Sequence, residues 1–140
     1  MEKSRARKII DQLMEKDYFS QWMGIKCLEE SEGFCRLQMT VSKQMCNGFS
    51  IAHGGIAYSF ADTALAFASN SRGRKAVSIE TSISHMKPLL AGELIIAITE
   101  EINVSNHIAI YTVKLQKENG SLVALFKGTV YITDEPWNIQ

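Results

Sequence analysis

Hydrophobic and polar positions divide the first third of the chain into a helix and an extended region. Residues 3–17 carry apolar side chains on one helical face and charged side chains elsewhere, which predicts an amphipathic packing helix. Residues 22–41 read as extended, most clearly from Cys35 to Val41, where apolar and polar positions alternate. A glycine-bearing loop, "MCNGFSIAHGG", follows this region.

The rest of the chain reads as β-structure preceded by one very apolar helix. Residues 55–69 suit a helix, and Gly73 is a plausible stop for it. Four segments rich in Ile, Val, Thr, Tyr or Phe predict strands at residues 76–85, 93–103, 106–117 and 121–132. Successive strands joined by short turns pair antiparallel, and the apolar helix has the composition to cover one face of their sheet.

The apolar helix contains one acid inside a stretch that is otherwise uncharged. Between Lys43 and Arg72 the only charged residue is Asp62, and apolar side chains cover nearly every direction around it. A helix of this kind is buried, and a buried carboxylate is costly unless it is paired or hydrogen-bonded. One interpretation is that the Tyr58 and Ser59 hydroxyls, or a strand backbone, satisfy it. The other is a general base or nucleophile whose pKa is raised by desolvation.

A Gly-Gly pair stands where this helix begins. The N–H groups of Gly54 and Gly55 lack intrahelical acceptors, and the helix dipole adds positive potential there. Such a position can stabilise a carbonyl oxygen that gains negative charge, although the glycines can also serve only as a tight turn. About 12 Å of helix separates Gly54 from Asp62, too far for one carbonyl to touch both. A catalytic interpretation therefore predicts a homodimer in which Gly54 of one chain meets Asp62 of the other, twice per dimer.

Composition and charge narrow the classes of function. The 140 residues include 15 Lys+Arg and 15 Asp+Glu, and this zero net charge argues against nucleic acid or an acidic membrane as the main partner. Three cysteines without a CxxC pair suggest reduced thiols in a cytoplasmic protein, and the three scattered histidines lack the spacing of a metal site. The charged N-terminus does not support a signal peptide, and the longest uncharged run is too polar for a membrane span.

Taken together, the central motif resembles a known family. The pattern is Asn47, Gly48, then His53-Gly54-Gly55, then Asp62 nine residues after the histidine. It is similar to the hotdog-fold acyl-CoA thioesterases of the PaaI type, from the phenylacetate pathway. The similarity continues in "VSIETSISHMKPLLAGE" and "ALFKGTVYIT" and covers residues 23–132.

The resemblance implies an α+β hotdog fold, in which an antiparallel β-sheet wraps a long central helix. It implies one domain over residues 1–140, with an N-terminal helix at 1–20, the hotdog core at 21–132 and a C-terminal tail at 133–140. It further implies an acyl-CoA substrate, hydrolysis without a metal or other cofactor, and a homodimer formed edge to edge. Such dimers often pair again into a tetramer.

The resemblance also implies roles for five residues. Gly54 N–H would polarise the thioester carbonyl, and Asp62 of the partner subunit would be the nucleophile or the general base. Asn47 would orient the thioester or the attacking water, His53 would help to hold the loop, and Ser78 would assist water placement. Simpler interpretations stay open, because Asn47 can be a turn residue, His53 a packed loop histidine and Ser78 an ordinary strand serine.

The remaining candidates concern the backbone donors and the binding of CoA. Gly55 is counted with Gly54 among the catalytic candidates. Three cations could meet the phosphates of CoA, although exposed charges are more often only solvated: Arg72, Arg74 and Lys87. His85 stands where the family often has an aromatic residue before a basic-Pro turn, and we place it with the substrate-binding candidates.

Two other functions are possible on the same fold. The first is a non-catalytic acyl-CoA-binding protein such as a sensor, although sensors typically carry a DNA-binding segment that this chain lacks. The second is a dehydratase or hydratase, which needs a histidine paired with an acid at other positions than His53 and Asp62.

Overall fold

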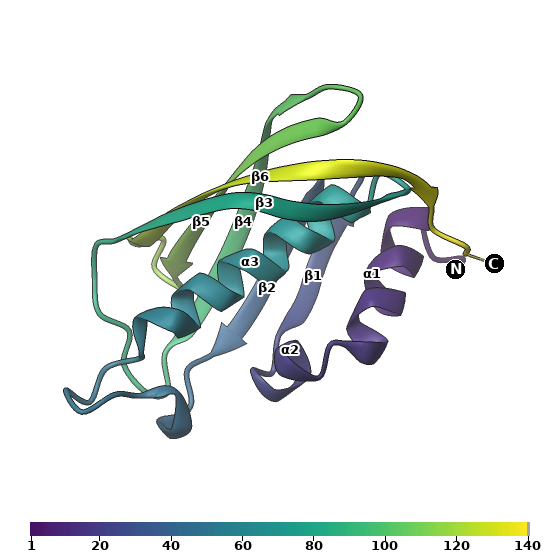
Figure 1. The fold of residues 1–140 in the computed structure, drawn as a ribbon. Coiled ribbons are helices and arrows are strands. Elements are labelled where there is room, and N and C mark those ends of the chain that lie inside the picture. The colour runs from purple at the N-terminus through teal and green to yellow at the C-terminus, as the bar shows by residue number, and fades with distance from the viewer. Residues whose placement is uncertain (140) are drawn as a thin grey trace.

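Six strands form one antiparallel sheet that curves around a long helix (Figure 1). The computed structural model describes residues 1–139. Its helices are α1 (Arg5–Lys16), α2 (Tyr18–Trp22) and α3 (Gly54–Asn70), with a 3-10 turn at Lys43–Met45. Its strands are β1 (Lys26–Ser31), β2 (Phe34–Thr40), β3 (Arg74–His85), β4 (Leu94–Val104), β5 (Ile108–Lys117) and β6 (Leu122–Pro136). The strand order β1-β2-β4-β5-β6-β3 leaves β1 and β3 at the two edges of the sheet.

The predicted α+β hotdog architecture is confirmed, with three local differences. The extended region at 22–41 is a hairpin, because Gly33 adopts a φ of 77° between β1 and β2. The short helix α2 was not predicted; its N-cap is Asp17, whose carboxylate accepts the Ser20 N–H at 3.0 Å. Strand β6 continues into the predicted tail, since β3 pairs with it as far as Pro136.

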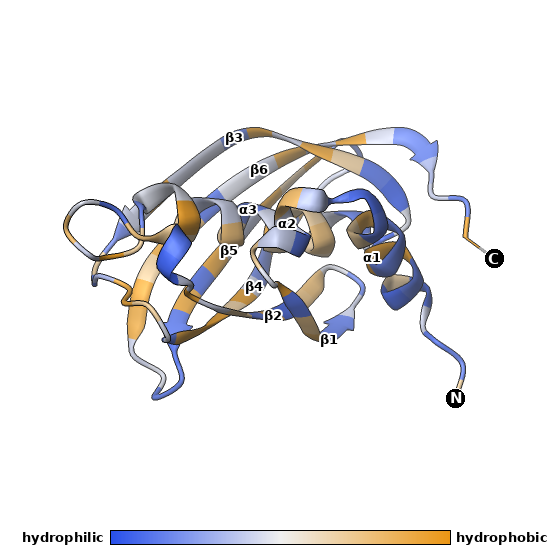
Figure 2. Ribbon diagram, turned by 90° about the horizontal axis from the view of Figure 1, so that it is seen from below, coloured by the Kyte–Doolittle hydropathy of each residue, from blue (hydrophilic) through white to orange (hydrophobic). Residues whose placement is uncertain are grey.

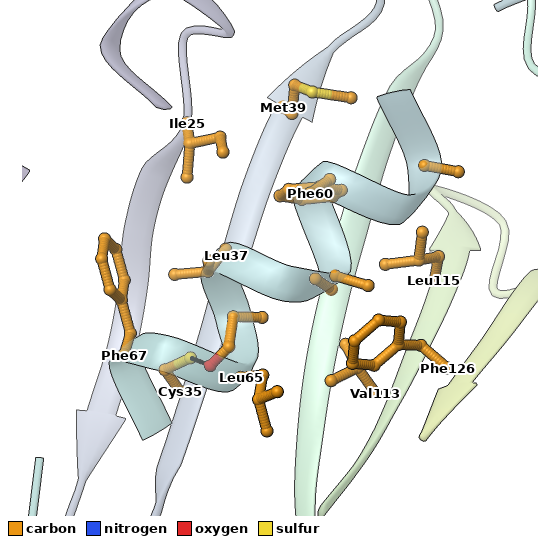
Figure 3. Close-up of a cluster of buried hydrophobic side chains, with 14 of the residues drawn as sticks. Ile25, Cys35, Leu37, Met39, Phe60, Leu65, Phe67, Val113, Leu115 and Phe126 are labelled. Carbon is orange, nitrogen blue, oxygen red and sulfur yellow. Dashed lines mark hydrogen bonds between the residues drawn. The ribbon is translucent and has the colours of Figure 1, made fainter. Parts of the chain in front are cut away.

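Helix α3 covers the inner face of the sheet. Figure 3 shows Phe60 and Leu65 of α3 in one buried cluster with side chains of the sheet such as Phe126 of β6. Close packing here requires a glycine on β6, because a Cβ at Gly128 would lie 2.4 Å from Leu65 Cδ2. The strands beneath show the alternation that places one face on the core, visible as bands of hydrophobic and hydrophilic residues along β5 in Figure 2.

The helix is not buried on every side, which differs from the prediction. Eleven of its 17 residues are buried, but one stripe remains partly or fully exposed at spacings of three and four. The stripe consists of Gly55, Ser59, Asp62 and Ala66. The reason is geometric: the sheet and the N-terminal helices cover only part of the circumference of α3, so one chain leaves the acid-bearing side open.

Among the described residues, no helix is long and apolar enough to cross a membrane. In the same part of the chain, no three His, Cys, Asp or Glu side chains form a group that could hold a metal ion.

Candidate active site

The start of α3 is organised by His53. This residue is the N-cap, and its Nδ1 accepts a hydrogen bond from Gly55 N–H at 2.9 Å. Its backbone N–H donates to Met45 O at 2.8 Å, which ties the helix to the preceding turn. Because Nδ1 is an acceptor, the uncharged imidazole carries its proton on Nε2. His53 therefore caps the helix and fixes the loop that leads into it.

Because of this cap, the backbone N–H groups of Gly54 and Gly55 differ, although the sequence grouped the two glycines together. Gly55 N–H is occupied by His53 Nδ1, and Ile56 N–H donates to His53 O at 2.8 Å. Gly54 N–H has no acceptor among residues 1–139. It stands at the positive end of a 17-residue helix, where an incoming oxygen with negative charge is favoured. Gly54 is therefore the first free backbone donor of α3.

Asn47 contributes both a turn and a free amide group. Its Oδ1 accepts the Phe49 N–H at 2.9 Å, and its backbone N–H donates to Ile51 O at 2.8 Å. The turn is tight enough to place Ser50 at a φ of 63°, in the left-handed region. With Oδ1 engaged, Nδ2 has no partner in the described chain and can donate outward.

These groups line one cavity of about 430 Å³, which we call the donor pocket. It lies where the loop before α3 meets the β3–β4 connection and the start of β6. Its polar lining is Asn47, His53, Gly54, His85 and Lys87. Its apolar lining is Ile51, Ala52, Ala57, Met86, Pro88, Leu89, Val123 and Ala124. No carboxylate lines this pocket.

Asp62 lies in a different cavity of about 250 Å³, which we call the acid pocket. It is bounded by α3, β3 and β6, and Ser78 lines it beside Asp62. The remaining lining residues are Leu65, Ala66, Ser69, Ala76, Val77 and Val130. The structure thus brings Asp62 and Ser78 together, and it keeps both apart from Gly54 and Asn47 within one chain.

The half-buried Asp62 carboxylate has no hydrogen bond or ion pair with any described residue. Tyr58, one of its two expected local partners, is instead hydrogen-bonded through its hydroxyl to Thr81 of β3. The Ser59 hydroxyl makes no hydrogen bond to it either. Burial raises the pKa of Asp62, and the nearby Asp17 carboxylate raises it further. Neither hydroxyl, nor any other described residue of the same chain, therefore satisfies Asp62, and its role as a base or nucleophile stays a prediction.

The cations expected to meet CoA occupy two places. Arg72 donates to both carboxylate oxygens of Glu101, at 2.6 and 2.5 Å, and Arg74 donates to Thr133 O at 2.7 Å. Both stand beyond the C-terminal end of α3 and outside the donor pocket. Lys87 lines the donor pocket and forms no ion pair with a described residue.

Two contributions were missed by sequence reasoning. Asp17 acts on Asp62 from the junction of α1 and α2, and no local pattern links residues so far apart. The wall of the donor pocket formed by Leu89 and Val123 comes from segments that only the sheet topology brings together. The available sequence signal for this wall was the "HMKP" turn after a predicted strand, which leads directly into Leu89.

Known proteins share this architecture and sequence. A family model described as Thioesterase superfamily matches residues 49–124. The acyl-coenzyme A thioesterase PaaI of Escherichia coli is 34% identical over 116 residues, which is 83% of each chain. The structure of the E. coli PaaI protein from the phenylacetic acid degradation operon superposes with a TM-score of 0.92 at 31% identity, covering 94% of this chain and 96% of that one.

A second solved structure gives the same result. A mutant of the phenylacetic acid degradation protein PaaI from Thermus thermophilus is 38% identical, with a TM-score of 0.79 over 82% of this chain and 98% of that one. The family match covers more than half of the present chain and includes the end of the loop before α3, all of α3 and strands β3 to β5. The chain therefore belongs to the thioesterase superfamily, as a PaaI-type enzyme with the hotdog fold.

Proposed function

We propose that this protein hydrolyses acyl-CoA thioesters at sites shared between two subunits. One observation carries the proposal: the donor pocket has free hydrogen-bond donors and no carboxylate, while the acid pocket holds an unpaired carboxylate. Hydrolysis of a thioester needs both, a donor for the carbonyl oxygen and a base or nucleophile for the carbonyl carbon. The name of the E. coli relative, an acyl-coenzyme A thioesterase, supports the choice of substrate.

A homodimer can unite the two pockets. Strand β3 is an edge strand, and its Val77 and Ile79 side chains are each 58% exposed. An unpaired edge with exposed apolar residues is a surface on which a second copy can pair. With two α3 helices antiparallel across a two-fold axis, Gly54 of one chain approaches Asp62 of the other, and the symmetry repeats this contact. Further pairing into a tetramer stays a prediction.

The groups have distinct tasks in such a site. The thioester carbonyl oxygen accepts the Gly54 N–H, which favours the negative charge that develops there. Asn47 Nδ2–H orients the thioester or the water. In the general-base route, Asp62 of the partner subunit takes a proton from water while the water oxygen bonds to the carbonyl carbon. The C–S bond then breaks and CoA leaves as a thiolate. Asp62 gives the proton that it took from water to this thiolate.

In the nucleophilic route, the same carboxylate attacks directly. A mixed anhydride forms, the thiolate leaves, and water hydrolyses the anhydride to restore Asp62. Ser78 lines the acid pocket beside Asp62, a position suited to holding the attacking water in either route. Lys87 lines the donor pocket, where its charge can meet a phosphate of CoA. Arg72 and Arg74 can contact CoA only after their hydrogen bonds to Glu101 and to Thr133 O break.

Thiol release from a panel of acyl-CoA substrates tests the proposal. We expect turnover by the wild type and a fall of about 10²- to 10⁴-fold in kcat for Asp62→Asn, the range for loss of a general base. Asp11→Asn is the matched control, because Asp11 lies on α1 outside both pockets and pairs with Lys3 at 2.7 Å. Wild-type turnover by a folded Asp62→Asn protein would falsify the assignment.

The panel also separates this proposal from its alternatives. Equilibrium binding of acyl-CoA without thiol release would identify a non-catalytic acyl-CoA-binding protein. Formation of an enoyl product without free thiol would identify a dehydratase.

A further inference from the structure

His85 stands over the start of α3, at the end of the edge strand β3. It pairs in register with the buried Ala124 of β6, on the sheet face that carries α3. A Cβ placed on Gly54 would lie 3.6 Å from His85 Nε2 and 3.7 Å from Cε1. Standard bond lengths then limit the distance between Gly54 N and His85 Nε2 to about 6 Å. His85 makes no hydrogen bond with any described residue, so its ring nitrogens are free.

Two donors within this limit can share one acceptor when they stand somewhat closer than its upper end. A single oxygen at about 2.9 Å from each nitrogen is compatible with a nitrogen–nitrogen distance of up to about 5.8 Å. The neutral imidazole with its proton on Nε2 donates from that nitrogen, and so does the imidazolium. Both groups line the donor pocket, so an oxygen placed there by a ligand can reach both of them.

The His53 cap limits the number of backbone donors that α3 can offer to a carbonyl oxygen in the donor pocket. An oxyanion site commonly uses two or more donors, and the start of a helix can offer several N–H groups. Here His53 Nδ1 occupies Gly55 N–H, and His53 O occupies Ile56 N–H. The helix therefore offers one free donor to this pocket, Gly54 N–H, and any further donor has to come from a side chain, of which Asn47 and His85 line the pocket.

We propose that His85 Nε2–H is a second donor to the thioester carbonyl oxygen, beside Gly54 N–H, and so a catalytic residue of this chain. This role rests on the proposed thioester hydrolysis. In the carbonyl form the His85 bond orients the substrate. As the tetrahedral intermediate forms, the oxygen gains negative charge and the same bond strengthens, which lowers the barrier.

The competing role for His85 is to form part of the pocket wall for CoA or the acyl group. Two non-hydrolysable ligands distinguish these roles. One is an acyl-CoA ketone analogue, in which a CH2 group replaces the sulfur and the carbonyl oxygen is kept. The other is the matching S-alkyl-CoA thioether, which keeps the sulfur and lacks the carbonyl oxygen. Only the ketone can accept a hydrogen bond from His85 at the carbonyl position.

Titration calorimetry with both ligands tests the proposal in the wild type, His85→Phe and His85→Gln. His85→Phe keeps a ring of similar size without a donor, and His85→Gln restores an N–H at the end of the side chain. We expect His85→Phe to weaken ketone binding by about 3- to 10-fold, the range for one hydrogen bond, and to leave thioether binding unchanged. We expect His85→Gln to recover most of the loss.

Thiol-release kinetics give the catalytic half of the test. The loss of one oxyanion donor predicts a fall of roughly 10²-fold in kcat for His85→Phe, a smaller change in KM, and partial rescue in His85→Gln. His107→Phe is the matched control, because His107 packs on Tyr131 at 5.5 Å, outside the donor pocket.

Two results would overturn the proposal. Equal weakening of both ligands by His85→Phe would make His85 a wall residue, and unchanged ketone binding would remove it from the carbonyl altogether. If the wild type binds both ligands but releases no thiol from any acyl-CoA, the proposed hydrolysis fails. The ketone and thioether affinities still report on the His85 contact in that case.

Discussion

The donor pocket and the acid pocket lie along the same helix and present opposite chemistry. The first residue of α3 has a backbone N–H without an acceptor, at the positive end of the helix dipole. In the middle of α3, every backbone group is used within the helix, and the free group is the Asp62 carboxylate. The same helix thus supplies a free hydrogen-bond donor at its start and a free carboxylate in its middle.

The two regions also differ in how their local structure is stabilised. The start of α3 is held by hydrogen bonds that His53 accepts from Gly55 N–H and Ile56 N–H, so its free donor is fixed in direction. Asp62 is held only by its place on the helix, and burial without a partner makes its ionised form less stable. Preorganised donors and a desolvated base are both typical of catalytic sites. Because about 12 Å of helix lies between them, one carbonyl meets both groups only in the shared dimeric site that we propose.

In the donor pocket, the largest effect is expected from loss of the Gly54 N–H. Gly54→Pro removes the free N–H, and proline is well tolerated at the first position of a helix. The preceding His53 already has φ −56° and ψ 139°, a conformation compatible with a following proline. We expect kcat to fall by roughly 10²- to 10³-fold.

Gly54→Ala isolates the contribution of the N–H. Its added Cβ makes only an ordinary contact, at 3.6 Å from His85, and the N–H is retained. Thiol-release rates of the two variants are compared at equal folded concentration. If Gly54→Ala and Gly54→Pro lose the same activity, the backbone donor has no part in the reaction.

The acid pocket predicts a shift in the pH profile. Asp62 has to be ionised to act, so the rate falls as pH drops through its pKa. Burial raises that pKa, with a further contribution from Asp17, so the acid limb of kcat/KM lies above the range of an ordinary aspartate. Asp17→Asn removes the repulsion and keeps a residue that caps α2, so the limb moves to lower pH. A limb that stays in place would mean that Asp17 does not act on the titrating group.

A smaller effect is expected from the cap itself. His53→Ala deletes the acceptor for Gly55 N–H and should lower the free energy of unfolding by about 1 kcal/mol. His53→Asn supplies another good N-cap residue and should recover most of that stability. Urea unfolding measures both variants. Equal stability of His53→Ala and the wild type would show that the cap contributes little to the fold.

Much of the fold followed from periodicity. Segments rich in β-branched and aromatic residues predicted the strands that became β3 to β6, and the apolar helix was placed within one residue at each end. The helix α2 was missed because five residues are too few to show a helical period, although Asp17 was an available local cap signal. The extension of β6 was missed because pairing with Arg74 and Lys75 stabilises a polar sequence that has no strand pattern of its own.

The site was only partly predictable for a similar reason. Spacing identified Gly54 and Asp62 as groups that one carbonyl cannot join, which follows from helix geometry alone. The sequence did not separate Gly54 from Gly55, because that difference depends on the rotamer of His53. It also did not show that Tyr58 turns to Thr81, or that Glu101 holds Arg72, since both partners lie on distant strands.

Subunit complementation tests the shared site most directly. Chains carrying Gly54→Pro and chains carrying Asp62→Asn are co-expressed with different affinity tags, and the heterodimer is isolated and assayed for thiol release. Each parent homodimer lacks one half of both sites, whereas the heterodimer has one intact site and one doubly altered site. We predict about half of the wild-type activity per dimer, with both parents nearly inactive. A folded heterodimer as inactive as its parents would contradict a site built from Gly54 of one subunit and Asp62 of the other.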